Sequence, residues 1–132
     1  MRTKPCLSLT DVKKILEACE AEAVKNRWNV EVAIVDEGAH LLGFQRMDGA
    51  GPISAEVAIG KARTSALTKR PSKFFEDRAK DRRPLRAFRP GVLIQGALPI
   101  MHQNECVGAI GVSGVRSHED EQIALAGLNA LG

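Results

Sequence analysis

The spacing of the predicted strands constrains the fold of this chain more than any other feature. The alternating segment 30–34 precedes the turn Asp36-Glu37-Gly38, and a second strand is expected from about His40 to Arg46. The second half of the chain adds three more candidate strands, at residues 91–95, 98–103 and 106–113. Connections this short join antiparallel neighbours, because parallel strands need a long crossover. The sequence therefore predicts a five-stranded antiparallel sheet.

Segments with helical periodicity stand at both ends of the chain. Hydrophobic residues recur at spacings of three and four from Leu9 to Lys25, which predicts an amphipathic helix. Ser8 and Asp11 predict a capping box at its start. A last helix is expected to begin at Ser117, with Asp120 completing a second capping box.

Two more helices are expected in the middle of the chain. One begins at Pro52 and runs to about Thr68, and a shorter one follows Pro71 around Phe74 and Phe75. The length of 132 residues, 44% of them hydrophobic, suits one domain with a buried core. We expect a single α+β domain over residues 1–132, with helices on both faces of the sheet.

Charge and cysteine usage narrow the classes of partner and location. Lys and Arg exceed Asp and Glu by 19 to 16 and gather in segment 69–89, which is typical of a solvated face or a subunit contact. Nucleic acid is not favoured as a partner, because the chain has one Trp, four Phe and no Tyr, and shows no recognised nucleic-acid motif. The chain shows no signal peptide and no membrane-spanning segment, and Cys6, Cys19 and Cys106 lack C-x-x-C spacing. We therefore expect a cytoplasmic protein with reduced thiols and no membrane association.

Four segments carry a family resemblance: 34–42 (IVDEGAHLL), 46–50 (RMDGA), 58–64 (AIGKART) and 107–114 (VGAIGVSG). In this order they resemble the GlcG/HbpS-like family, or haem-degrading domain family, which is related to the C-terminal domain of PduO-type corrinoid adenosyltransferases. The resemblance covers nearly the whole chain. It implies a profilin-like fold, a homo-oligomer and the binding of haem or a related tetrapyrrole.

Asp36 and His40 lie on either side of the predicted hairpin turn. The carboxylate could orient the imidazole for proton abstraction, which makes both residues candidate catalytic groups. The alternative is a structural turn in which the carboxylate accepts backbone N–H bonds.

Lys61, in the predicted middle helix, is a candidate for both catalysis and ligand binding. The alternative for this lysine is an ion pair with Glu56 or Asp48. Arg46 and Asp48 are candidate ligand-binding residues, with Arg46 expected to hold an anionic group.

Small residues end the last predicted strand, and Gly111, Ser113 and Gly114 are candidate ligand-binding positions there. Backbone N–H groups in such a turn can bind an anion, whereas the alternative is a tight turn that needs glycine for its own geometry. We expect the turn after Asp36, the helix with Lys61 and the segment around Ser113 to surround one cavity, either within one protomer or across two.

The function that these observations favour is the binding of a small anionic ligand, with haem as the candidate cofactor. The candidate iron ligands are the three thiols and His40, His102 and His118. Arg46 and the basic segment 69–89 are expected to neutralise the propionates.

The alternative function is an enzyme of the tautomerase or isomerase kind that abstracts a proton from a small organic acid. Asp36 and His40 or Lys61 would be its acid–base groups, and Arg46 would bind the substrate carboxylate. The sequence shows no motif that identifies a metal site.

Overall fold

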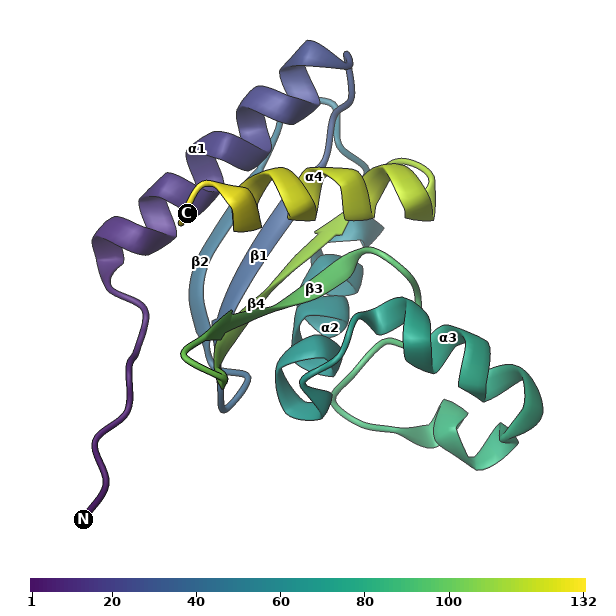
Figure 1. Ribbon diagram of the computed structural model, residues 1–132. Coiled ribbons are helices and arrows are strands. Elements are labelled where there is room, and N and C mark those ends of the chain that lie inside the picture. The colour runs from purple at the N-terminus through teal and green to yellow at the C-terminus, as the bar shows by residue number, and fades with distance from the viewer.

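The computed structural model describes residues 1–132 (Figure 1). Its elements follow one another as α1 (Leu9–Lys25), β1 (Glu31–Asp36), β2 (Leu41–Arg46), α2 (Ile53–Thr68), α3 (Ser72–Asp81), the short 3₁₀ helix η1 (Arg83–Ala87), β3 (Ala97–His102), β4 (Glu105–Ser113) and α4 (Ser117–Asn129). None of the helices combines the length and the hydrophobicity that crossing a lipid bilayer requires.

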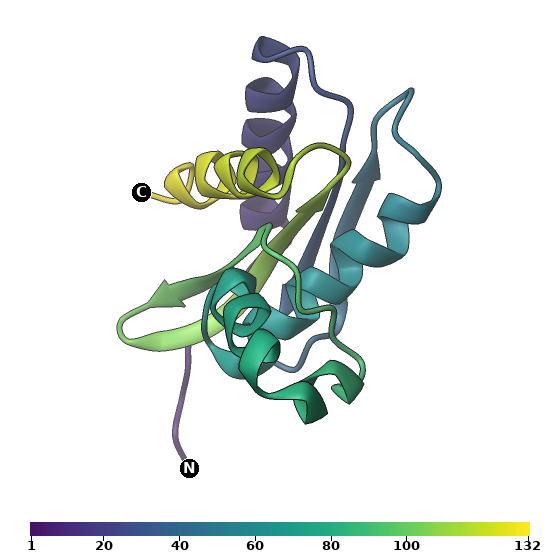
Figure 2. The same ribbon diagram turned by 90° about the vertical axis from the view of Figure 1, so that its right-hand side faces the viewer.

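The strands form one four-stranded antiparallel sheet with the order β2-β1-β4-β3. Helices α1 and α4 cover one face of this sheet and α2 covers the other (Figures 1 and 2). The expected α+β class, the antiparallel pairing and the helices on both faces are confirmed. A profilin-like arrangement stays a prediction.

The predicted fifth strand, at residues 91–95, is wrong. This segment is an irregular loop on α2. The Val92 N–H donates to the Gly60 carbonyl at 3.0 Å and to Thr64 Oγ1 at 2.9 Å. Because α2 takes up this backbone donor, Val92 does not extend the ladder of a neighbouring strand.

One of the two predicted capping boxes forms. Asp11 N–H donates to Ser8 Oγ, and Ser8 N–H donates to the Asp11 carboxylate. At α4 the predicted box is wrong, because Glu119 accepts the backbone N–H of Arg116 and Asp120 points into the interior. Asp120 is thereby free for a different partner.

The two faces of the sheet pack in different ways. The face toward α1 and α4 is built from large aliphatic side chains such as Ile15, Ile34, Ile110 and Ile123. The face toward α2 is built mainly from alanines, at positions 33, 58, 62, 66 and 109. Small side chains let a helix lie close to a sheet, so α2 is in near-backbone contact with β4.

Candidate functional site

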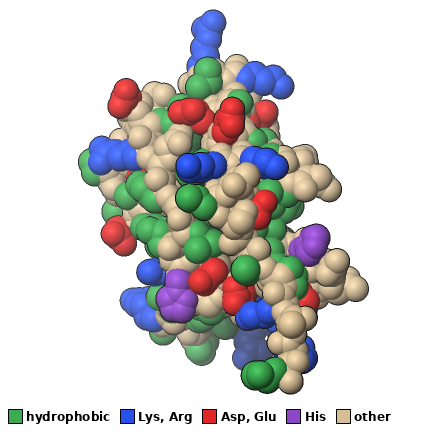
Figure 3. Space-filling view, turned by 90° about the vertical axis from the view of Figure 1, so that its left-hand side faces the viewer, with side chains coloured by type: hydrophobic (Ala, Val, Ile, Leu, Met, Phe, Trp, Pro, Cys, Tyr) green, Lys and Arg blue, Asp and Glu red, His purple; other side chains and the backbone are tan.

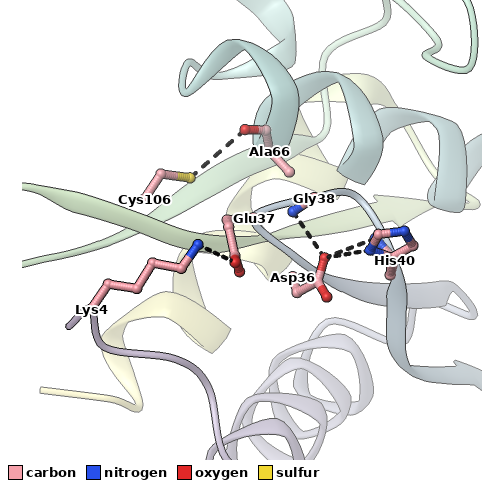
Figure 4. A network of polar contacts seen from close by, with 7 residues as sticks. All are labelled: Lys4, Asp36, Glu37, Gly38, His40, Ala66 and Cys106. Atoms are coloured by element: carbon pink, nitrogen blue, oxygen red, sulfur yellow. Dashed lines mark hydrogen bonds and ion pairs between the residues drawn. The ribbon is translucent and has the colours of Figure 1, made fainter. Parts of the chain in front are cut away.

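The β1–β2 turn holds Asp36 and His40 at one end of the sheet (Figure 4). Asp36 Oδ1 accepts the backbone N–H groups of Gly38 and His40, both at 2.9 Å, and lies 3.4 Å from His40 Nδ1. The imidazole is 84% exposed. These contacts match the structural alternative for the turn, and a catalytic role for the pair stays a prediction.

The N-terminal segment is fastened to the same turn. Lys4 Nζ donates to Glu37 Oε1 at 2.6 Å (Figure 4). This hydrogen bond raises the pKa of Lys4 and lowers the pKa of Glu37. The contact helps to hold the segment that precedes α1 beside the sheet.

Lys61 is buried in an ion pair with Asp120. Lys61 Nζ lies 3.0 Å from Asp120 Oδ2 and donates to the Val112 carbonyl at 3.0 Å, and both side chains are 2% exposed. Asp120 Oδ1 accepts the Val115 N–H at 3.1 Å. Burial raises the pKa of Asp120, and the Lys61 ammonium and the Val115 N–H oppose that shift.

The partner of Lys61 is thus Asp120 and not Glu56 or Asp48. The pair joins α2 to α4 across the end of β4. It uses two of the three ammonium hydrogens of Lys61 inside the protein. A role for Lys61 in catalysis or ligand binding stays a prediction.

A row of polar side chains crosses the opposite end of the sheet. Glu31 is paired in register with Arg46 on one side and with Ser113 on the other. Arg46 donates to the Ala50 carbonyl at 3.2 Å, and Asp48 is exposed in the loop that follows β2. Ligand binding by Arg46 and Asp48 stays a prediction.

Glu31 is a group that the sequence reasoning missed. Its side chain is fully buried, and neither carboxylate oxygen has a hydrogen-bond partner. Burial raises the pKa of Glu31, and the charge of Arg46 opposes the shift. The available signal was an acidic residue at the start of an otherwise hydrophobic strand.

Replacing Glu31 with glutamine is expected to stabilise the fold at high pH. Because the folded-state pKa of Glu31 is raised, its contribution to stability is full below its ordinary value of 4.5 and is lost as pH rises through the folded pKa. Urea unfolding should give the variant a gain of about 1–2 kcal/mol at pH 8 and almost none at pH 4. The exposed Glu17→Gln is the control, and a gain of equal size at both pH values would contradict the raised pKa.

The space next to Gly111 and Gly114, two of the predicted ligand-binding positions, is filled by other backbone atoms of the chain. A Cβ at Gly111 would lie 2.2 Å from the Ala58 carbonyl oxygen and 2.6 Å from the Ala62 nitrogen. Gly114 has φ of 142°, and a Cβ there would lie 2.8 Å from the Asn29 carbonyl oxygen. The contacts of Gly114 favour the tight-turn alternative, whereas Gly111 lies within β4 and packs against the backbone of α2. Anion binding at Gly111, Ser113 and Gly114 stays a prediction.

The three predicted places do not converge within one protomer. Asp36 pairs with Gly108, whereas Glu31, at the other end of β1, pairs with Ser113. Five strand residues at roughly 3.3 Å each separate these ends by about 16 Å. The expectation of one cavity around Asp36, Lys61 and Ser113 is therefore wrong for a single protomer. None of Asp36, His40, Lys61 and Arg46, the residues of the enzyme alternative, lines the three cavities described below.

A separate cavity lies between the N-terminal segment, β3 and the end of α4. It has a volume of about 470 Å³. Its walls are formed by Pro5, Cys6, Leu7, Asp11, Pro99, Ile100, Met101, His102, Val107, Leu128, Asn129, Leu131 and Gly132. Hydrophobic residues make up seven of these thirteen positions, and the exposed His102 and Cys6 add an imidazole and a thiol.

Of the predicted iron ligands, only His102 and Cys6 line this cavity. The buried Cys19 thiol donates to the Ile123 carbonyl, and burial raises its pKa to about 12. Cys106 is also buried, with Sγ 3.4 Å from the Gly108 carbonyl oxygen. No three side chains of the metal-binding types gather in one place.

The comparisons with known proteins agree with this fold. The family model described as "Haem degrading protein HbpS-like" matches residues 7–129. Protein GlcG of Escherichia coli strain K12 is 38% identical over 114 residues, which are 86% of this chain and 85% of GlcG. A crystal structure of a Streptomyces reticuli HbpS double mutant has 32% identity and a TM-score of 0.95, and the match covers 100% of this chain and 91% of that chain. The structure of PduOC in complex with heme, 24% identical with a TM-score of 0.90 over 96% of this chain and 95% of that chain, shares the fold. The chain therefore belongs to the GlcG/HbpS-like family.

Proposed function

We propose that this protein binds haem, or a related flat tetrapyrrole, in the cavity between the N-terminal segment, β3 and the end of α4. The family description names haem. The cavity volume of about 470 Å³ lies within the usual range of small-molecule pockets. The observation that carries the proposal is a cavity in which seven of thirteen lining residues are hydrophobic and His102 supplies an imidazole.

The residues of this cavity suit a haem in two respects. His102 and Cys6 are of the side-chain types that bind haem iron, and Leu7, Ile100 and Leu128 provide hydrophobic walls for the macrocycle. We assign the iron to His102, because strand β3 holds its backbone in the sheet, whereas Cys6 lies in the irregular segment before α1. Bound haem would itself supply any oxygen or electron-transfer chemistry.

The lining of this cavity contains no lysine or arginine that would pair with the propionates of a haem. Asp11 is the one charged residue that lines the cavity, and hydrogen bonds from Ser8 hold its pKa below the ordinary value. Arg46 and the basic segment 69–89 do not line it, so in this proposal they do not neutralise the propionates.

Titration of the purified protein with haemin is expected to give a saturable change in the Soret region. Replacing His102 with alanine should weaken haemin binding at least tenfold, because an iron–imidazole bond is lost. His118→Ala is the matched control, since His118 is also exposed but lies outside the cavity. Cys6→Ser tests the thiol in the same way.

Three outcomes would count against this assignment. A linear response without saturation would indicate nonspecific association. Equal loss in the His102→Ala and His118→Ala variants would remove the cavity from the explanation. Loss in Cys6→Ser alone would move the iron to the thiol. Circular dichroism of each variant shows that the fold is retained.

We further propose that the protein is a cytoplasmic homo-oligomer. Exposed hydrophobic side chains support the assembly: Leu9 and Val24 on α1, and Leu41 and Leu42 on β2. Figure 3 views the side of the molecule that lies to the left in Figure 1, and hydrophobic side chains gather across the middle of that face. Three free cysteines are consistent with a reducing compartment. Light scattering on the haemin samples gives the number of subunits.

A further inference from the structure

Two adjoining hollows flank the loop that follows η1: the smaller is lined by α2 and this loop, and the larger by α3, η1 and this loop. Their volumes are about 410 and 260 Å³. Both are lined by Arg89, Gly91 and Val92, so they meet along one stretch of the loop that follows η1. In Figure 1, α3 lies on the opposite side of the molecule from the N-terminal end of the chain.

The loop that separates these hollows is built onto α2. Thr64 Oγ1 lies 2.9 Å from both the nitrogen and the carbonyl oxygen of Val92, accepting from the first and donating to the second. Gly60 leaves space for the Val92 side chain, since a Cβ at Gly60 would lie 2.3 Å from a Val92 methyl. A Cβ at Gly91 would lie 2.2 Å from the Phe88 ring. The side chains on this loop are therefore carried by a tightly packed backbone.

Positive charge dominates the lining of the two hollows. Lys80 and Arg86 line the larger one, Arg63 lines the smaller one, and Arg89 lines both. Each hollow is lined by one acidic residue, Glu76 in the larger and Glu56 in the smaller.

None of the three arginines of this lining is neutralised, and two of them, Arg63 and Arg86, are held in place. All five ion pairs of the structure use lysine or histidine as the cation, so no arginine is paired with a carboxylate. Arg63 Nε donates to the Ala39 carbonyl at 3.4 Å, and Arg86 Nε donates to the Ala79 carbonyl at 3.2 Å. Both contacts use Nε and leave the terminal nitrogens of each guanidinium for another acceptor. A guanidinium fixed in this way is preorganised to bind phosphate or carboxylate.

We propose that these two hollows form a binding site for a small organic anion with more than one phosphate or carboxylate group. Arg89 lies where the hollows meet and contacts the ligand from both sides. Arg63 and Arg86 bind anionic groups in the smaller and the larger hollow, and Phe88, Leu93 and Ile94 receive an apolar part of the ligand. This assigns a function to the basic segment that the haem proposal leaves unused.

Isothermal titration with inorganic pyrophosphate and with citrate tests the site in its two ligand chemistries. At least one of them should bind saturably, and Arg89→Gln should weaken that binding about tenfold through the loss of charge-assisted hydrogen bonds. Arg116→Gln is the matched control, because Arg116 is exposed and lies outside both hollows. Haemin binding by the Arg89→Gln variant should be unchanged, so this proposal and the haem proposal fail separately.

The titrations separate the proposal from nonspecific effects of charge. Binding of pyrophosphate but not citrate assigns the site to phosphates, and the reverse assigns it to carboxylates. Equal weakening in Arg89→Gln and Arg116→Gln would overturn the site, as would the absence of saturation with both anions. Tighter binding of a single-stranded RNA oligonucleotide than of either anion, lost in Arg89→Gln, would replace the small ligand with nucleic acid.

Discussion

Replacing Asp120 with alanine is expected to lower the free energy of unfolding by about 3–5 kcal/mol, the cost of leaving a buried charge without its partner. Lys61 would keep only the Val112 carbonyl as an acceptor, in a site where its side chain is 2% exposed. The Val115 N–H would also lose the acceptor that orders the turn into α4. Urea unfolding followed by circular dichroism measures the change.

A second variant separates the charge from the packing. Replacing both partners, as Lys61→Met with Asp120→Leu, removes the ion pair without stranding a charge, and it should recover much of the stability lost by Asp120→Ala. Asp77→Ala is the control for a surface ion pair, because Asp77 and Lys73 are each 48% exposed. A loss below about 1 kcal/mol for Asp120→Ala would show that the interior hydrates or rearranges around Lys61.

Replacing Gly111 with alanine is expected to cost about 3 kcal/mol, the upper part of the range for overpacking a core. The added Cβ would meet the Ala58 carbonyl oxygen at 2.2 Å and the Ala62 nitrogen at 2.6 Å. Both are backbone atoms, so no side-chain rotation relieves the contact and α2 must move away from β4. Thermal unfolding measures the loss.

Gly51→Ala is the matched control for this substitution. Nothing lies within 4 Å of a Cβ at Gly51, so the variant should unfold at the temperature of the unmodified protein. The comparison also tests the two interpretations of Gly111. A Gly111→Ala protein of normal stability that had lost an anionic ligand would favour the binding role over the packing role.

Local patterns in the sequence carried most of the fold. The helical spacing from Leu9 to Lys25 and the Ser8–Asp11 box predicted α1 and its start, because both depend on residues within one or two turns. For segment 91–95 the same local patterns predicted a strand, and the prediction was wrong. It is short and hydrophobic like a strand, but Thr64, a residue 28 positions from Val92, takes its backbone hydrogen bonds.

The candidate site was less predictable, because it depends on contacts across long stretches of chain. Lys61 was recognised as a notable lysine, but its partner Asp120 lies 59 positions away and was assigned to a helix cap. His102 was one of several equivalent histidines until the N-terminal segment, β3 and α4 were placed around it. Glu31 looked like the polar edge of a strand, and its burial arises only once α2 covers that face.

The alanine-lined contact between α2 and the sheet determines where a small molecule can bind to this fold. The backbones of α2 and β4 are so close at Gly111 that no ligand fits between the helix and the sheet. The three cavities described above lie at the edges of the fold. A ligand could then bind and dissociate without any separation of α2 from the sheet. Its residence time would depend on the side chains at the entrance of the cavity, and the packing of the interior would not change.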